Sequence, residues 1–330
     1  SGAFQLAAFS LHRDVMSYSA TTAHSFPEWL RSFDFISANW LIKGAAIRNP
    51  FYAFLVGDLH SDVTDIPFQL LFVTLILALF LAKKNEPDSK MAKSDSLLTI
   101  IILGLSLGFL AFVDTWSYPT YMLFAILAFI LLRTNLGWKR LLGVIALSII
   151  FYLPYHITRG SGGLKEIGVI TGRTELLEFI EVFALFLFAL FSFFYVTFRG
   201  RLFKGETVIV MTVLVIIIAS VSFLLNFQLL LILIPLILVP LYCVYKARDK
   251  KETEFMLTLA LAGALIVLFC EIFYIKTPLG GDFARFVTVV HFYLQIWVLF
   301  ALAAAYAVYW VLNNTRSRLK YVWVTLLFLL

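Results

Sequence analysis

The chain has 330 residues, of which 62% are hydrophobic and only 14% are charged, and its mean hydropathy is +0.93. A soluble domain cannot cover so many uniformly apolar segments, whereas a lipid bilayer accepts them directly. The composition therefore excludes a soluble globular protein and predicts an all-α, polytopic transmembrane helix bundle. The net charge of +6 is explained by membrane orientation and predicts no nucleic-acid partner.

The N-terminal part of the chain differs from the rest. Residues 1–11 resemble the tail of a truncated helix, and residues 12–50 mix Trp and Phe with Lys and Arg, which is typical of an interfacial segment. We therefore divide the chain into residues 1–65, a helix remnant with an extracytoplasmic or interfacial segment, and residues 66–330, a transmembrane helical domain.

Apolar stretches separated by basic loops predict about nine complete spans, each approaching the roughly 20 residues that cross a bilayer. A further helix begins at Tyr321 and is cut off at the end of the chain. The expected spans are Ile66–Ala82, Leu97–Val113, Pro119–Leu132, Leu141–Ile157, Leu176–Phe198, Thr207–Asn226, Leu229–Tyr245, Phe255–Tyr274 and Phe286–Leu312.

Most of the 26 Lys and Arg residues fall in the loops after the first, third, fifth, seventh and ninth spans. By the positive-inside rule these loops face the cytoplasm. All five His residues and several Asp and Glu residues lie at or just beneath the opposite surface. We therefore expect an integral protein of the cell membrane whose active side is extracytoplasmic.

Two patterns predict local structure. Gly104 and Gly108 have the small-xxx-small spacing that is typical of helix packing in membranes. Glu175, Glu178 and Glu181 recur at the outer end of the fifth span. We expect Glu175 and Glu178 to stabilise the helix N-terminus, and the alternative is that the three acids line a polar cavity.

The first candidate site is Gly57-Asp58-Leu-His60-Ser-Asp62, at the outer end of the first span. If the backbone turns at Gly57, the polar side chains converge on one ligand. Asp58 and His60 are then candidate catalytic residues, and Asp58, His60 and Asp62 are candidate ligands of a divalent metal, Mg or Mn. The alternative is that they cap the helix that begins near Ile66 and face water.

The second candidate site places a carboxylate among aromatic rings in the next outer loop. Asp114, Trp116 and Tyr118 are candidates for binding a sugar or the acceptor, since aromatic rings can stack on a sugar face. The alternative is an ordinary interfacial aromatic belt with Pro119 at a helix start.

The third candidate site follows the eighth span. Arg285, His291 and Lys276 are candidate ligands of a lipid phosphate at the membrane surface, and Glu271 and Asp282 are candidate contacts to the sugar or acceptor. The alternative is an internal ion pair of Arg285 with Asp282 or Glu271.

These three segments also resemble the motifs of one family. Phe51–Val63 is similar to "FxFLxGDLHPH", Asp114–Tyr121 to "NTWDxPTY" and Arg285–Trp297 to "RMNTVFKxYxQxW". Together they resemble the YYY family of uncharacterised polytopic membrane proteins from archaea and Chloroflexi, which is grouped with the GT-C glycosyltransferases. The resemblance implies a GT-C-like helix bundle that moves a sugar from a polyprenyl-phosphate carrier on the extracytoplasmic side.

The chain departs from the family pattern at several motif positions, among them Asp62 in place of His and His291 in place of Lys. Asp62 still offers oxygen to a hard cation, and His291 makes a phosphate contact dependent on pH. We therefore expect an extracytoplasmic glycosyltransferase with membrane lipids and a polyprenyl-phosphate sugar as partners. The alternative is a non-enzymatic subunit of a membrane complex, or a transporter of lipid-linked material.

Overall fold

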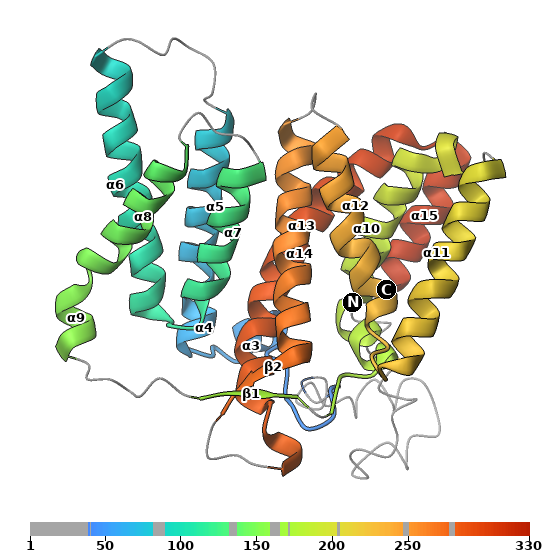
Figure 1. Ribbon diagram of the computed structural model, residues 1–330, viewed down its shortest axis with the longest axis horizontal. Helices are drawn as coiled ribbons and strands as arrows, with labels where there is room; N and C mark the ends of the chain where they lie inside the picture. The colour runs from blue at the N-terminus through green and yellow to red at the C-terminus, as the bar shows by residue number, and fades with distance from the viewer. Residues whose placement is uncertain are drawn as a thin grey trace.

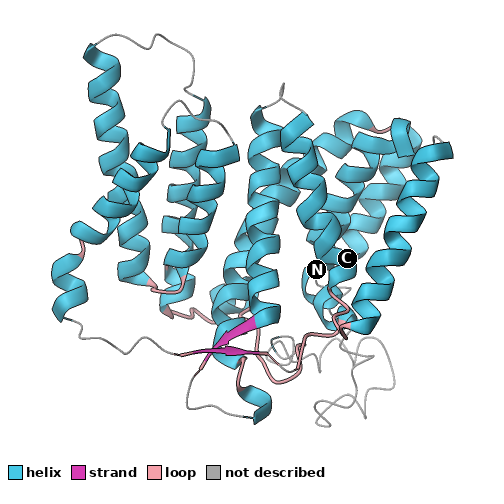
Figure 2. Ribbon diagram, in the orientation of Figure 1, coloured by secondary structure: helices cyan, strands magenta, loops and turns pink. Residues whose placement is uncertain are grey.

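The computed structural model describes residues 39, 41–81, 90–131, 137–158, 166–170, 172–202, 205–246, 251–276 and 281–330. These residues form a helix bundle with two short strands at one end (Figures 1 and 2). The helix remnant expected at residues 1–11 and most of the interfacial segment lie outside the described residues. The division of the chain at residue 65 stays a prediction.

The secondary structure is almost entirely α-helical. The helices are α3 (Pro50–Leu55), α4 (Ser61–Thr64), α5 (Ile66–Leu81), α6 (Lys90–Val113), α7 (Ser117–Leu131), α8 (Gly137–Ile150), α9 (Leu153–Thr158), α10 (Leu176–Leu202), α11 (Gly205–Leu224), α12 (Leu230–Lys246), α13 (Lys251–Ile272), α14 (Phe286–Asn314) and α15 (Ser317–Leu329). The remaining elements are the strands β1 (Ile167–Val169) and β2 (Phe273–Ile275) and the 3-10 helix η2 (Gly281–Phe283).

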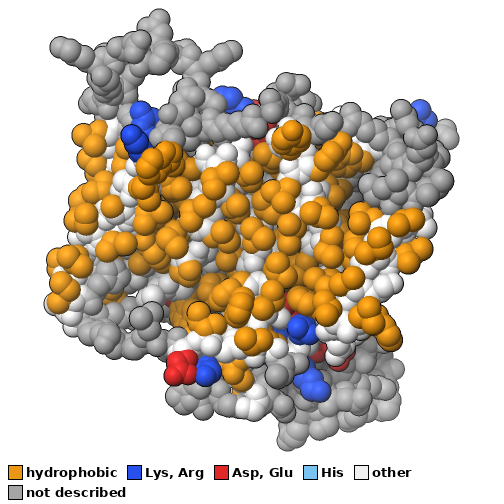
Figure 3. All heavy atoms as spheres, viewed as in Figure 1, with side chains coloured by type: hydrophobic (Ala, Val, Ile, Leu, Met, Phe, Trp, Pro, Cys, Tyr) orange, Lys and Arg blue, Asp and Glu red, His pale blue; other side chains and the backbone are white. Residues whose placement is uncertain are grey.

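Four helical segments are long and apolar enough to cross a membrane by length and composition: Ser61–Leu81, Leu176–Phe198, Lys251–Ile272 and Phe286–Asn314. Shorter apolar helices are Leu97–Val113, Ser117–Leu131, Thr212–Leu224, Leu230–Tyr245 and Leu319–Leu329. An apolar belt covers the middle of the molecule between two charged edges (Figure 3). The all-α membrane architecture is thus confirmed, and the nine complete spans are not.

The expected fourth span is divided into two helices. The helix α8 ends at Ile150 and α9 begins at Leu153. The reason is Pro154, which lacks the N–H group that would bond the carbonyl of Ile150 and whose ring crowds that carbonyl.

Helices α13 and α14 lie side by side at the centre of the bundle, with α10, α12 and α7 against them (Figure 1). On the other side of α7, α6 packs closely on α8. A Cβ atom at Gly104 would lie 2.7 Å from Leu147 Cβ, and one at Gly108 would lie 2.5 Å from the carbonyl oxygen of Ser148. The small-residue spacing predicted for helix packing is therefore confirmed.

The end of the bundle that carries α3, α4, β1 and β2 lies at the bottom of Figure 1. The strands pair antiparallel, with Gly168 opposite Tyr274. At the start of α10, the Glu178 carboxylate accepts a hydrogen bond of 3.2 Å from the backbone N–H of Glu175. This contact stabilises the helix N-terminus as predicted. The positive-inside rule predicts that this end is extracytoplasmic, and the candidate residues cluster here.

Candidate functional site

The turn after α3 presents the Asp58–His60 pair. Gly57 has a φ of +66°, a left-handed conformation that favours glycine, and the backbone N–H of Asp58 donates to the carbonyl of Ala53 over 2.8 Å. The backbone therefore does turn at Gly57, which was the condition for the three polar side chains to converge. Beyond it, Asp58 Oδ1 accepts a hydrogen bond from the His60 backbone N–H (3.0 Å) and also contacts His60 Nδ1.

The contact with Asp58 sets the tautomer of His60. A carboxylate only accepts hydrogen bonds, so Nδ1 carries the proton and Nε2 keeps its lone pair. The imidazole is 67% exposed and the Asp58 side chain 20% exposed. Burial raises the pKa of Asp58, but the hydrogen bonds from His60 and the charge of Arg48 outweigh it, and the net pKa is below the usual 3.8. Asp58 is therefore ionised at neutral pH.

Arg48 joins the two carboxylates of the first motif. Its Nη1 contacts Asp62 Oδ1, and its Nε lies 3.7 Å from Asp58 Oδ2. Asp62 is fully buried, whereas Arg48 is 20% exposed. The Arg48 guanidinium thus lies against both carboxylates, where the predicted divalent metal would have to bind. Among the described residues, no group of three or more His, Cys, Asp and Glu side chains is arranged to hold a metal ion.

His291 connects the first motif to the second and third. Its Nδ1 lies 3.5 Å from Asp62 Oδ2, within ion-pair distance but without hydrogen-bond geometry. Its ring stacks on Trp116 with 4.8 Å between the centroids and 6° between the planes. His291 stands where the motif that the sequence resembles has Lys, and Asp62 stands where the first motif has His. These two replacements therefore lie beside each other.

Asp114, two residues before Trp116, is 3% exposed. It accepts hydrogen bonds from Ser117 Oγ (3.1 Å) and from the backbone N–H of Trp116 (3.4 Å). Burial raises the pKa of Asp114 above its usual 3.8, and the neighbouring charge of Asp62 acts in the same direction. Both carboxylate oxygens of Asp114 therefore have partners within the chain. A role of Asp114 in sugar binding stays a prediction.

A buried polar layer continues inward from Asp114. Ser117 Oγ accepts hydrogen bonds from Gln69 Nε2 (3.2 Å) and Gln295 Nε2 (2.7 Å). Gln69 Nε2 also donates to Asp65 Oδ2 (3.2 Å), and the Tyr121 hydroxyl donates to Gln69 Oε1 (2.9 Å). All of these side chains are buried. The layer therefore links α5, α7 and α14 through hydrogen bonds.

Arg285 belongs to a second cluster. Its Nη2 donates to Glu271 Oε1 (2.6 Å) and to Thr174 Oγ1 (2.7 Å), and the Tyr293 hydroxyl donates to the same Glu271 oxygen (3.2 Å). Arg285 is 7% exposed and Glu271 is fully buried. The alternative of an internal ion pair between these two residues is confirmed. The side chain of Asp282 lies outside the described residues.

Two other predicted residues also have separate partners. Lys276 pairs with Glu166 over 2.7 Å at the surface, where the two side chains are 50% and 78% exposed. The Tyr118 hydroxyl lies 2.8 Å from Ser148 Oγ on α8. The structure therefore brings together one set of predicted residues: Asp58, His60, Asp62, Asp114, Trp116 and His291.

The comparison with protein families gives one match. The model of an uncharacterized membrane protein family, DUF2298, covers residues 1–300. The chain belongs to this family. No curated protein and no solved structure matches it. Membership in DUF2298 supports an integral membrane protein.

Several residues of these clusters in this DUF2298 protein were not among the predicted site residues, and Arg48, Asp65 and Gln69 are examples. Asp65 and Gln69 have the i, i+4 spacing that places two residues on one helix face, so this spacing was a usable signal. The sequence carried no comparable signal for Arg48.

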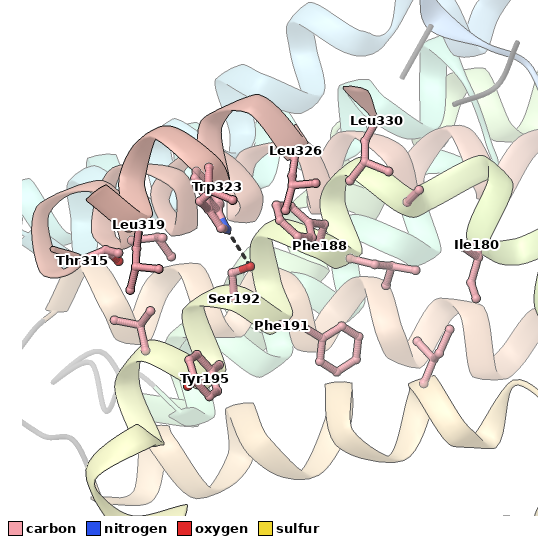
Figure 4. Close-up of a pocket in the computed structure, with 16 residues that line it drawn as sticks. Ile180, Phe188, Phe191, Ser192, Tyr195, Thr315, Leu319, Trp323, Leu326 and Leu330 are labelled. Atoms are coloured by element: carbon pink, nitrogen blue, oxygen red, sulfur yellow. Dashed lines mark hydrogen bonds between the residues drawn. The ribbon is translucent and has the colours of Figure 1, made fainter. Parts of the chain in front are cut away.

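One cavity lies away from these polar clusters. It is a groove of about 740 Å³ lined mainly by apolar side chains of α10 and α15. In Figure 4 the Trp323 indole N–H donates to Ser192 Oγ over 2.8 Å. No Asp, Glu, His, Lys or Arg is among its lining residues. The groove therefore offers no charged or imidazole side chain for acid–base chemistry.

Proposed function

We propose that this protein is an extracytoplasmic glycosyltransferase of GT-C type, which transfers a sugar from a polyprenyl-phosphate carrier to an acceptor hydroxyl. The observation that carries the proposal is the Asp58–His60 pair. An ionised carboxylate there orients an exposed imidazole at the end of the bundle that the positive-inside rule predicts to be extracytoplasmic. The resemblance of the three motifs supports the donor class and the GT-C grouping.

In this proposal His60 is the general base and Asp58 orients it. The acceptor hydroxyl loses its proton to His60 Nε2, and its oxygen forms a bond to the anomeric carbon of the donor. The bond between that carbon and the phosphate oxygen breaks, and its electron pair leaves with the polyprenyl phosphate. Asp58 stabilises the imidazolium that forms, because its carboxylate contacts Nδ1.

His291 is the best-placed contact for the leaving phosphate. Its Nδ1 is directed at Asp62, so Nε2 is the nitrogen that can meet a phosphate oxygen when the ring is protonated. The stacked Trp116 holds the ring in place. Arg285, which Glu271 already neutralises, instead fixes the start of α14 from which His291 projects.

A divalent metal does not fit the residues of the first motif. Bound Mg or Mn would stabilise the charge on the leaving phosphate. Asp62 is engaged by Arg48 and His291, and Asp58 by His60 and Arg48. We therefore assign no step of the reaction to a metal at Asp58, His60 and Asp62.

The test measures sugar transfer by the purified full chain in liposomes. The donors are a panel of radiolabelled polyprenyl-phosphate hexoses, and short oligosaccharides serve as acceptors. We expect His60→Gln to lower turnover by a factor of about 10² or more, which is the usual contribution of a general base. Asp58→Asn should also lower turnover, because it removes the charge that stabilises the imidazolium.

The matched control is Glu166→Gln, at the exposed ion pair with Lys276, which should keep full turnover. Unchanged turnover in His60→Gln would remove His60 from the reaction. A wild-type protein that transfers sugar from no polyprenyl-phosphate donor would contradict the proposed function itself.

A further inference from the structure

The apolar groove of about 740 Å³ runs lengthwise between α10 and α15. Thr315 and Leu319 line one end, Ile180 and Leu330 line the other, and Trp323 lies between the two ends (Figure 4). This volume is in the range of sites that bind small molecules, about 300 to 1,000 Å³. The groove is therefore an elongated apolar site with room for a hydrocarbon chain.

The groove extends about as far as one leaflet of a bilayer is thick. Leu319 and Leu330 line its opposite ends, and a helical rise of about 1.5 Å per residue places them about 16 Å apart along α15. The hydrocarbon core of a bilayer is about 30 Å thick, so each leaflet contributes about 15 Å. One acyl chain of a phospholipid in that leaflet therefore fits along the groove.

The Thr315 end of the groove lies far from the Asp58–His60 pair. Helix α14 carries His291 near its start and ends at Asn314, directly before Thr315, and its 29 residues span about 43 Å. The positive-inside rule predicts that the Thr315 end is cytoplasmic. A lipid whose headgroup lies at Thr315 therefore belongs to the cytoplasmic leaflet, and its phosphate is too far from His60 to be part of the sugar donor.

Two basic residues lie at this end of the groove. Arg316 directly follows Thr315, Lys320 directly follows Leu319, and one helical turn at the start of α15 separates the two basic residues. Arg316 is exposed and Lys320 is half-buried. Within the described part of the chain, no carboxylate pairs with either side chain. Basic groups between helices on the cytoplasmic side of a membrane attract anionic headgroups, and the N-terminus of α15 adds the positive end of its dipole.

We propose that this groove binds one anionic phospholipid of the cytoplasmic leaflet. An acyl chain lies along Trp323, and the phosphate group contacts Arg316 and Lys320. A zwitterionic lipid would fill the apolar groove equally well, so the two basic residues make the site selective for negative charge. An apolar helix of a second copy would cover the groove but leave both basic residues without an anion. The site shares no residue with the Asp58–His60 pair, so the inference stands whether or not the protein transfers sugars.

The experiment measures quenching of Trp323 fluorescence by brominated lipids, with the full chain reconstituted in phosphatidylcholine vesicles. The chain has seven Trp residues, so the signal of Trp323→Phe is subtracted. Brominated phosphatidylglycerol should quench Trp323 at lower lipid fractions than brominated phosphatidylcholine. We expect a preference of about 10- to 25-fold, because each basic residue contributes a factor of about 5.

Two double variants test the role of charge. Arg316→Gln/Lys320→Gln should reduce the preference to about 2-fold or less. The matched control Lys139→Gln/Arg140→Gln removes two basic residues at the start of α8, away from the groove, and should keep the preference. Native mass spectrometry of the bound lipids gives the same ratio with Trp323 intact, which serves if Trp323→Phe does not fold.

The proposal is overturned if the two brominated lipids quench Trp323 equally, or if the preference survives in Arg316→Gln/Lys320→Gln. No quenching by either lipid would also overturn it, and a dimer in the same vesicles would then identify a second copy as the occupant. Displacement of brominated phosphatidylglycerol by a polyprenyl phosphate at lower fractions than by unlabelled phosphatidylglycerol would overturn it as well and identify the sugar carrier as the occupant.

Discussion

Replacing Arg48 by Met should destabilise the protein mainly by leaving Asp62 without its closest cation. Asp62 is fully buried, and its remaining basic neighbour is His291 at 3.5 Å. Breaking a buried ion pair by removing one partner costs about 3 to 5 kcal/mol. Arg48 is 20% exposed, so we expect the lower end, about 3 kcal/mol, and a fall of at least 6 °C or so in the melting temperature.

A double-mutant cycle separates this effect from lost packing. Asp62→Asn removes the buried charge, so the double variant Arg48→Met/Asp62→Asn should lose less stability than the two single variants together. We expect a coupling of about 1 to 3 kcal/mol from melts in detergent. Additive effects within about 0.5 kcal/mol would refute the reasoning, because they would mean that Arg48 contributes nothing through Asp62.

Two further predictions concern packing and pH. Gly108→Ala should destabilise the α6–α8 contact by about 1 to 3 kcal/mol, because its Cβ would lie 2.5 Å from the Ser148 carbonyl oxygen; an unchanged melting temperature would contradict this packing. The lowered pKa of Asp58 should stabilise the fold above the usual value of 3.8, and this stability should fade as the pH falls below 3.8 through the folded-state pKa. In melting experiments from neutral to acidic pH, Asp58→Asn should therefore lose less stability than the wild type. Identical pH profiles of the two proteins would argue against the contacts of Asp58 with His60 and Arg48.

Features that depend on local sequence were predicted correctly. The packing of Gly104 and Gly108 and the acidic start of α10 both follow from residue types at short spacing. The break between α8 and α9 was missed because the hydropathy of the segment outweighed Pro154. Its effect on the hydrogen bond to Ile150 was nevertheless readable from the chain.

Pairings between distant residues were harder to predict. Arg285 had two acidic candidates in its own neighbourhood, and the structure pairs it with Glu271. The contact of His291 with Asp62 could not be derived from spacing, since the two residues lie on helices that are far apart in the chain. The contacts of Arg48 with Asp58 and Asp62 could not be derived from spacing either. The two carboxylates follow Arg48 in the chain, beyond α3 and the turn at Gly57.

The sequence by itself determined the class of this protein, the places of its apolar helices and the end of the bundle at which polar groups gather. Transfer free energies add along the chain, so hydropathy and charge can be summed without coordinates. Only the tertiary structure decided that Ser117 Oγ accepts hydrogen bonds from both Gln69 and Gln295, and that Arg48 lies against both Asp58 and Asp62. Hydrogen bonds and ion pairs depend on distances of a few ångströms between helices, and helix packing sets those distances.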